Sequence, residues 1–345
     1  MPVSAKIPFM NNEPVTSPDG NVPAPVPLCV PGSLPGRLLG VDAGGGATRV
    51  VLVTGGQVVR RQIAPPMNAL LTEDVAERLL DLVTGWDATA AGIGLPGLRS
   101  PAARARLAAE LSSRAGRPVH VTGDGETALL GAFGARPGIA VFAGTGSGAT
   151  GWDGRRWARA GGHGFLLGDE GSAYWIGRAA ANAALRWEDG MGGSAALRDA
   201  VVQVSGGDLA ALVAEVHAHP SERPLLSRLA PVITDLAGED ETARYIAERA
   251  AIHLAALAQT LRVNLGPLPV CGLGGVLGAP VIWDRFAELT GAVRPQAPPE
   301  IGAALLAWRG GLDAKYERPS SSASVDALAA SESDAGRGGR DADHD

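Results

Sequence analysis

Three short apolar runs separated by glycines open the regularly patterned part of the chain. They cover residues 37–42, 49–53 and 57–64, with glycines at 44–46 and 55–56 between them. Short runs rich in β-branched residues and joined by glycine turns are typical of antiparallel strands. The pattern therefore predicts a three-stranded antiparallel meander.

Helical and extended segments alternate after the meander. Leu71, Val75, Leu79 and Leu82 form one apolar stripe at the spacing of an amphipathic helix. The further predicted elements are a strand at 90–95, an Ala/Arg-rich helix at 102–115, a strand at 118–121 and a short helix after Glu126. The predicted order of the first half is β-β-β-α-β-α-β-α.

The second half repeats this order and enlarges it with helices. Strands are predicted at 138–143, 150–152, 156–160 and 268–271, and helices at 172–203, 209–218, 243–265, 280–289 and 299–309. A glycine turn follows the first of these strands, as it does in the first half. The repetition predicts an α/β protein built from two related domains.

The two ends of the chain differ in composition from the body. The first 36 residues hold nine of the 25 prolines, which exclude regular helix and central strand. From residue 319 onward, serines, glycines and scattered acids without apolar periodicity indicate disorder. We predict a disordered proline-rich arm at 1–36, a first domain at 37–136, a second domain with a helical insertion at 137–315, and a disordered tail at 316–345.

Length, charge and cysteine content narrow the class of protein. The chain has 345 residues, and single hydrophobic cores stop growing near about 250 to 300 residues, which favours two domains. A net charge of −6 without any basic run argues against nucleic acid as a partner. Cys29 and Cys271 alone cannot form a disulfide framework or a zinc site. No segment approaches the roughly 20 apolar residues of a membrane span, so we expect a cytoplasmic protein.

Glycine-rich segments carry the candidate chemistry. Residues 40–48 and 143–151 each follow an apolar run, and no Gly-Lys-Ser/Thr follows that would make either a Walker loop. Glycines let successive backbone N–H groups converge on a polyphosphate, and Thr48, Thr145 and Ser147 add hydroxyl donors. A plain hairpin turn explains either segment as well. A third segment, 271–276, is explained on its own by a strand-to-helix packing turn.

One long stretch has a specific resemblance. Residues 144–148 read Gly-Thr-Gly-Ser-Gly, and residues 161–178 read Gly-Gly-His-Gly-Phe-Leu-Leu-Gly-Asp-Glu-Gly-Ser-Ala-Tyr-Trp-Ile-Gly-Arg. Together they resemble the N-acetylglucosamine kinase group of the BadF/BadG/BcrA/BcrD-type ATPase family, within the actin-like ATPase superfamily. The resemblance implies two actin-like (ribonuclease H-like) domains, each a mixed five-stranded sheet with flanking helices, and ATP in the cleft between them.

The resemblance also implies which residues bind the nucleotide. Two glycine hairpins would grip the ATP phosphates from opposite sides, and a later glycine pair would underlie the adenosine. The matching residues are Gly44, Gly45, Gly46 and Thr48, then Gly144, Thr145, Gly146 and Ser147, then Gly274 and Gly275. Asp42, at the end of the first strand, would hold Mg²⁺ through water. An aspartate that caps its own turn is the alternative for Asp42.

Asp124 is the candidate catalytic base. It matches the aspartate that, in the resembled kinases, takes the proton from the accepting sugar hydroxyl. A helix N-cap is the alternative role for an aspartate at this place. The family usually shows Asn or Thr before this aspartate and small residues after it, whereas this chain reads Gly123-Asp124-Gly125-Glu126. A second carboxylate so close could raise the pKa of Asp124, and Glu126 could tune or replace the base.

Four residues match acceptor-binding positions. They are Asn68, Gly162, His163 and Asp169. Without the resemblance, Asn68 would be a turn former and Asp169 an acid placed near a helix N-terminus. Human-type N-acetylglucosamine kinases carry Trp where His163 stands, so the acceptor preference is expected to differ.

The resemblance implies an ATP- and Mg²⁺-dependent kinase that phosphorylates an amino sugar of the N-acetylglucosamine or glucosamine type. A family ATPase that activates a partner enzyme is the first alternative, and a non-catalytic sugar or nucleotide sensor is the second. The small-molecule sugar is the expected partner. The oligomeric state stays open, with a homodimer as one option.

Overall fold

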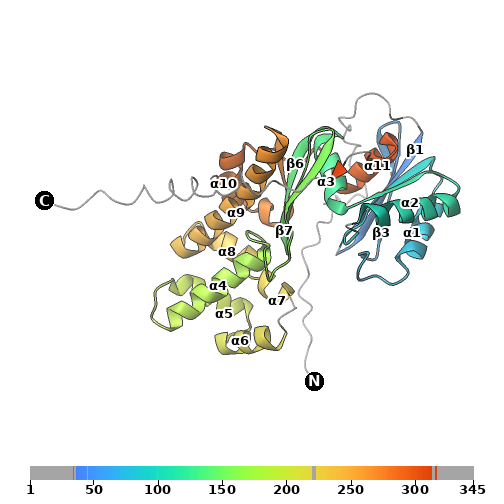
Figure 1. The fold of residues 1–345 in the computed structure, drawn as a ribbon. Helices are drawn as coiled ribbons and strands as arrows, with labels where there is room; N and C mark the ends of the chain where they lie inside the picture. Colours follow the sequence, from blue (N-terminus) through green and yellow to red (C-terminus); the bar gives the residue numbers. More distant parts are fainter. Residues whose placement is uncertain are drawn as a thin grey trace, which may run out of the picture.

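The computed structural model describes residues 34, 36–44, 46–98, 100–219 and 223–312, and the backbone of 315–316. The predicted arm and tail lie almost entirely outside these residues, as does Gly45. Two lobes, each built on one sheet, are visible in Figure 1. Along the described chain, no helix combines the length and the apolar content needed to cross a membrane.

The first sheet contains the predicted meander. Its strands are β1 (Arg37–Ala43), β2 (Thr48–Thr54), β3 (Gln57–Ala64), β4 (Ala90–Gly94) and β5 (Val119–Thr122), in the order β3-β2-β1-β4-β5. The meander strands pair antiparallel, whereas β4 and β5 add parallel to β1. The helices α1 (Val75–Thr84), α2 (Pro101–Ala115) and α3 (Asp124–Phe133) complete the predicted β-β-β-α-β-α-β-α order.

The second sheet repeats the arrangement of the first. Its strands are β6 (Gly138–Ala143), β7 (Ser147–Trp152), β8 (Arg156–Gly161), β9 (Val270–Leu273) and β10 (Lys315–Tyr316), in the order β10-β8-β7-β6-β9. The place that β5 takes in the first sheet is reduced here to one bridge between Cys271 and Val293. The predicted fold class, two mixed five-stranded sheets with flanking helices, is confirmed.

Eight helices of the second half are described. They are α4 (Ala173–Glu188), α5 (Ala195–Val204), α6 (Leu209–Ala218), α7 (Arg223–Ser227), α8 (Ala230–Leu236), α9 (Glu241–Leu265), α10 (Pro280–Thr290) and α11 (Pro299–Arg309). Helices α4 and α5 replace the single helical segment predicted at 172–203, because glycines with positive φ at 190, 192 and 193 interrupt it. Helices α7 and α8 are five and seven residues long, too short to produce a helical period in the sequence.

The predicted stripe of α1 was wrong at its first position. Leu71 is exposed and lies in a turn, in which its backbone N–H donates to the carbonyl of Asn68 at 3.1 Å. The helix begins at Val75, and Leu79 and Val83 are its fully buried residues. An apolar residue at helical spacing therefore extended the predicted helix by one turn beyond its real start.

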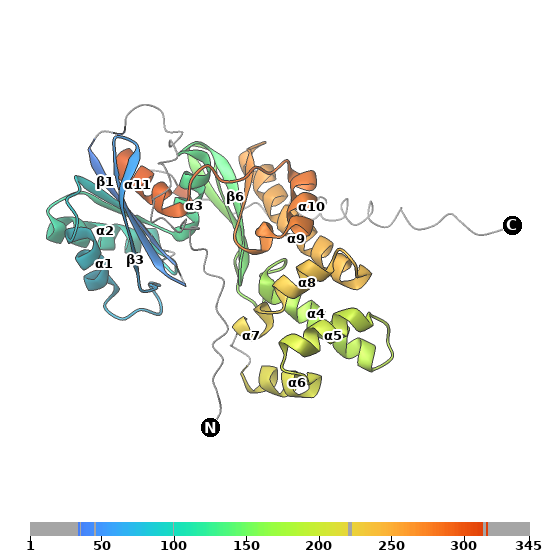
Figure 2. The same cartoon turned by 180° about the vertical axis from the view of Figure 1, so that it is seen from behind.

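The structure is layered, with α3 and α11 between the two sheets (Figures 1 and 2). Helices α1 and α2 cover the outer side of the first sheet, and α9 packs on β6, β7 and β8 of the second. Helix α11 comes from the end of the described chain yet packs on β1, β2 and β4 of the first sheet. The predicted division at residue 136 follows the chain order, and α11 crosses it in space.

Glycines allow this central layer to pack closely. A Cβ at Gly40 of β1 would lie 2.0 Å from the carbonyl oxygen of Glu300, and one at Gly92 of β4 would lie 1.9 Å from that of Ala303. A Cβ at Gly302 would lie 1.8 Å from the carbonyl oxygen of Thr127 on α3. Each distance is far below a van der Waals contact. Helix α11 can therefore seat on the first sheet and on α3 only where side chains are absent.

Gly302→Ala should destabilise the protein, because the added methyl overlaps backbone atoms that cannot rotate away. Overpacking of this kind costs typically about 1–3 kcal/mol, and we expect at least about 2 kcal/mol here. Denaturant unfolding measures the loss. Gly278→Ala is the control, since nothing lies within 4 Å of a Cβ placed there. Equal stability of the two variants would show that the α3–α11 contact tolerates a side chain.

Candidate active site

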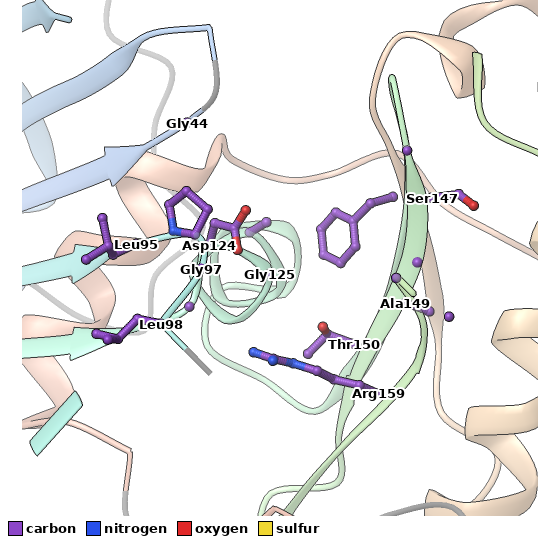
Figure 3. Close-up of a pocket in the computed structure, with 18 of the residues that line it drawn as sticks. Gly44, Leu95, Gly97, Leu98, Asp124, Gly125, Ser147, Ala149, Thr150 and Arg159 are labelled. Atoms are coloured by element: carbon purple, nitrogen blue, oxygen red, sulfur yellow. The ribbon is translucent and has the colours of Figure 1, made fainter. Parts of the chain in front are cut away.

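A cleft of about 750 Å³ lies between the two sheets. On one side it is lined where the parallel strands β1, β4 and β5 end, at Asp42, at residues 95–98 and at Asp124. On the other side it is lined by β7, β8 and the loop that follows β8. Ligands of open α/β sheets bind beyond the carboxyl ends of the strands, so the topology alone makes this cleft a candidate site. Figure 3 shows its two walls.

Asp124 projects into the cleft from the start of α3 (Figure 3). The N-cap residue of α3 is Gly123, so Asp124 is the first helical residue and is not the predicted alternative, a side-chain cap. Desolvation by the surrounding walls raises the pKa of Asp124, and the nearby Glu126 raises it further, while backbone N–H groups and Arg159 act in the opposite direction. The carboxyl is therefore exposed to a ligand and holds its proton more tightly than an ordinary aspartate.

Asp42 lines the cleft from the end of β1 and is almost completely buried. Burial raises its pKa to about 8, and the carboxylates of Glu300 and Asp124 raise it in the same direction. The Thr127 hydroxyl lies 3.4 Å from Asp42 Oδ1 and is the side-chain hydrogen bond that partly offsets this effect. The Asp42 anion thus lacks sufficient positive charge around it in the protein alone.

Glu300 is a second buried acid near Asp42, on the first turn of α11. Its Oε1 accepts from Arg61 Nη1 at 3.1 Å, and within the described part of the chain its buried Oε2 has no hydrogen-bond partner. Two under-compensated carboxylates beside a cleft suit a divalent cation. No group of three or more His, Cys, Asp or Glu suited to a metal occurs among the described residues, so phosphate oxygens and water would complete such a site.

The hairpin between β6 and β7 meets the start of α4. Gly146 and Ser147 line the cleft, and a Cβ at Gly146 would lie 2.7 Å from Asp169 Oδ2. The Ser147 hydroxyl donates to the carbonyl of Glu170 at 2.7 Å, and the Ala173 N–H donates to the carbonyl of Gly144 at 2.8 Å. The hairpin is therefore fixed to the α4 segment, and Gly146 is needed for the close approach of Asp169.

Asp169 itself is buried in the wall of the cleft with φ at 60°. A non-glycine residue in this left-handed region is uncommon and is often found at functional sites. Its backbone carbonyl accepts from the Ser172 N–H at 3.1 Å, and Ser172 is the N-cap of α4. The acid is thus held by the turn before α4 while a separate residue caps the helix.

The hairpin between β1 and β2 contributes Gly44 to the cleft wall. The Gly44 N–H donates to the carbonyl of Ala47 at 3.1 Å, which closes a tight turn. Thr48 is fully buried, and its hydroxyl donates to the carbonyl of Pro65 at 2.8 Å. In this structure the Thr48 hydroxyl supports the loop after β3, whereas Gly46 and Thr48 do not line the cleft.

Most of the predicted acceptor residues line the cleft, and one lies behind its wall. Gly162 and His163 line the cleft in the loop after β8, where Gly162 and Gly164 have positive φ, as does Gly161 at the end of β8. Asn68 is absent from the wall: its Oδ1 accepts from the Leu70 N–H at 2.9 Å. It lies directly behind Gly97, which does line the cleft, since a Cβ there would be 2.4 Å from Asn68 Oδ1.

The third glycine segment lies beside the β6–β7 hairpin but off the cleft wall. Gly274 has φ at 98°, and a Cβ there would be 2.3 Å from the carbonyl oxygen of Ala143. Nothing lies within 4 Å of a Cβ at Gly275. Gly144 and Thr145 are also absent from the wall. The close approach of Gly274 to β6 matches the packing turn that the segment indicates on its own.

Sequence reasoning missed three arginines at the cleft. Arg104 of α2, Arg159 of β8 and Arg223 of α7 line it. Arg104 and Arg159 both contact the fully buried Glu126. No local motif marks these arginines, because they come from three distant elements. The only available signal was Glu126 itself, an acid among the apolar residues of α3.

Comparisons with known proteins agree with this geometry. The sequence profile of the BadF/BadG/BcrA/BcrD ATPase family matches residues 39–307. No curated protein matches the chain at a significant level. Several solved structures do resemble it along most of its length, and their fold is the two-domain fold described above.

Three of these structures illustrate the range of similarity. A protein from Chromobacterium violaceum, provisionally described as an N-acetylglucosamine kinase, is 30% identical, with a TM-score of 0.64 over 79% of this chain and 98% of its own. A counterpart from Porphyromonas gingivalis, described in the same way, is 20% identical, with a TM-score of 0.59 over 79% and 98%. A ROK family glucokinase from Streptomyces griseus, in complex with glucose and AMPPNP, is 19% identical, with a TM-score of 0.53 over 79% and 100%.

The structures from Porphyromonas gingivalis and Streptomyces griseus, at 20% and 19% identity, show a similarity of fold alone. The family assignment depends on the profile, which spans most of the chain, and on the relative that is 30% identical over nearly its whole length. The residues that the profile matches include the strand ends that carry Asp42 and Asp124. The chain belongs to the BadF/BadG/BcrA/BcrD ATPase family.

Proposed function

We propose that this protein is an ATP-dependent kinase that phosphorylates a hydroxyl group of an amino sugar of the N-acetylglucosamine or glucosamine type. The observation that carries the proposal is the position of Asp124, an exposed carboxyl with a raised pKa between two glycine hairpins. Family membership supports the use of ATP, and the relative from Chromobacterium violaceum supports an amino sugar as the acceptor.

The nucleotide would lie with its phosphates between the two hairpins. Gly44 on one wall and Gly146 on the other are positioned for backbone contacts to phosphate oxygens. Gly45, Gly46, Thr48, Gly144 and Thr145 stay predicted contributors, and Gly274 and Gly275 would lie toward the adenosine. Asp42, with Glu300 behind it, would hold Mg²⁺, which neutralises the charge that develops on the transferred phosphoryl group.

The acceptor would lie beside the β6–β7 hairpin, against His163, Gly162 and Asp169. Asp124 would accept the proton of the attacking sugar hydroxyl. The hydroxyl oxygen would form a bond to the γ-phosphorus, and the bond between the γ-phosphorus and the leaving oxygen of ADP would break. Phosphoryl transfer needs mostly positioning and charge stabilisation, so one base of suitable pKa is sufficient. Asn68 would act indirectly, by shaping the wall at Gly97.

A partner-activating ATPase is the second candidate. Family members that carry a bridging iron–sulfur cluster need accessible thiolates, and Cys271 is fully buried with its pKa raised to about 12 by burial. This thiol is a poor cluster ligand. The buried thiol thus gives no support to the partner-activating ATPase, whereas the cleft lined by Gly162, His163 and Asp169 supports the kinase.

An ADP-release assay with a panel of acceptors tests the proposed function. N-acetylglucosamine, glucosamine, N-acetylmannosamine, glucose and water alone should be compared at equal ATP and Mg²⁺. We expect turnover with at least one amino sugar to exceed that with water by at least about 10²-fold, since cleft closure excludes water from the phosphoryl group. Turnover that is independent of added sugar would instead support the partner-activating ATPase.

Asp124→Asn should lower kcat by about 10²-fold or more, the scale of general-base catalysis, with ATP affinity nearly unchanged. Activity requires the deprotonated form of Asp124, whose pKa is raised. In the wild type, the acid limb of kcat/KM should therefore lie above the ordinary aspartate pKa of about 3.9. Steady-state kinetics across pH measures both. Activity within threefold of wild type would remove Asp124 from the mechanism.

Gly146→Val should weaken ATP binding while the protein stays folded. The new side chain would begin 2.7 Å from Asp169 Oδ2 and would push that carboxylate or the hairpin away. Calorimetric titration with a non-hydrolysable ATP analogue measures the affinity, and Gly278→Val is the matched control in open space. If the two variants bind the analogue equally well, the β6–β7 hairpin does not hold phosphate.

A further inference from the structure

Glu126 joins two arginines in a buried ionic cluster behind Asp124. Its side chain is completely buried, and its Oε1 accepts from Arg104 Nη1 at 2.8 Å and from Arg159 Nη2 at 2.7 Å. The side chains of Arg104 and Arg159 are 11% and 34% exposed, so both ion pairs are largely shielded from water. Removing one partner of a buried ion pair lowers the stability of a protein much more than removing one partner of an exposed pair.

The three residues come from different parts of the fold. Arg104 lies on α2 of the first lobe, Arg159 on β8 of the second, and Glu126 on α3 between them. Arg104 is further fixed by Nε donating to the carbonyl of Leu98 at 2.7 Å and by Nη1 donating to Thr122 Oγ1 at 3.3 Å. The cluster therefore connects β8 to a well-anchored point on the opposite lobe.

Gly123 makes room for this cluster directly before Asp124. A Cβ at Gly123 would lie 2.4 Å from Glu126 Oε2, 2.9 Å from Arg159 Nη2 and 3.1 Å from Arg104 Nη2. The charged groups thus pack against the backbone that carries Asp124. A shift of the cluster would be transmitted to the start of α3 and to the Asp124 carboxyl.

Glu126 is not placed to act as the base itself. It is completely buried and does not line the cleft, whereas Asp124 two residues earlier does. Its carboxylate is already committed to two guanidinium groups. Of the two roles that the sequence left open for Glu126, tuning or replacing the base, the geometry favours the first.

We propose that Glu126 is a positioning residue, which through Arg104 and Arg159 ties β8 to α2 and thereby fixes the separation of the two lobes and the orientation of Asp124. The part of this proposal that concerns the lobes depends on the ion pairs and not on the proposed function. The effect on catalysis rests on the proposed kinase function, so the tests below separate the two.

The cluster also sets the charge around Asp124. Glu126 raises the pKa of Asp124, and Arg159 lowers it. Among the described residues, the other charged or titratable groups that line the cleft are Asp42, Arg104, His163, Asp169 and Arg223, and Glu300 lies beside Asp42. Removing either end of the Glu126–Arg159 pair breaks the same contact but changes the charge near Asp124 in opposite directions.

Glu126→Gln and Arg159→Met therefore form a diagnostic pair. Both should lower kcat by about tenfold to 10²-fold, because small misplacements of catalytic groups have effects of this size. The acid limb of kcat/KM should move to lower pH in Glu126→Gln and to higher pH in Arg159→Met, by about 0.5 to 1 pH unit each. Arg159→Lys keeps the charge and should retain most of the activity.

Glu77→Gln is the matched control, since it removes one carboxylate from an exposed ion pair with Arg114 on the same lobe. It should match wild type in kcat and in pH profile. If Glu126→Gln and Arg159→Met also keep kcat within twofold, or if their acid limbs move together, Glu126 does not position the base.

Small-angle X-ray scattering tests the tie independently of any sugar. Glu126→Gln and Arg159→Met should have a larger radius of gyration than wild type and Glu77→Gln in the absence of ligands. A larger radius in both variants, together with no kinase activity in the wild type, would keep the tie and refute the kinase proposal. An unchanged radius in both would refute the tie. If Glu126→Gln does not fold, Arg159→Met and Arg159→Lys carry the same comparison, because Arg159 is partly exposed.

Discussion

Close packing of α3 against α11 between the two sheets is the constraint on which the rest of the structure depends. Backbone meets backbone at Gly302 and Thr127, and α11 seats on β1 and β4 at Gly40 and Gly92. These contacts bring the end of the described chain back to its first strand. They also hold the starts of α3 and α11, and with them Asp124 and Glu300, beside the end of β1. The cleft is therefore a consequence of how the central layer packs.

Charge in the cleft follows from the same packing. Asp42 faces the central layer because β1 alternates, with Leu38, Gly40 and Asp42 on one side and Leu39, Val41 and Ala43 on the other. Burial there makes the anion costly, so that its pKa rises to about 8. On α3, by contrast, the Glu126 carboxylate is matched by two arginines. One acid is left in need of a cation, and another is already neutralised by the protein.

The sequence supported the architecture more fully than the site. Strand periodicity and glycine turns predicted the meander and its repetition, because they reflect local rules that act within a few residues. Gly146 was predicted as a phosphate-binding glycine, but its closeness to Asp169 depends on the pairing of distant segments. The Arg104–Glu126–Arg159 cluster depends on three elements that meet only in the folded state. Thr48 shows the opposite case, in which a hydroxyl in a suggestive motif donates to the carbonyl of Pro65 instead.

We propose that nucleotide and sugar meet in this cleft at Asp124. A crystal structure with Mg²⁺, a non-hydrolysable ATP analogue and N-acetylglucosamine would decide this. We expect the γ-phosphate between Gly44 and Gly146, and a sugar hydroxyl within hydrogen-bond distance of the Asp124 carboxylate. A nucleotide bound away from both hairpins, or a sugar with no hydroxyl near Asp124, would contradict it.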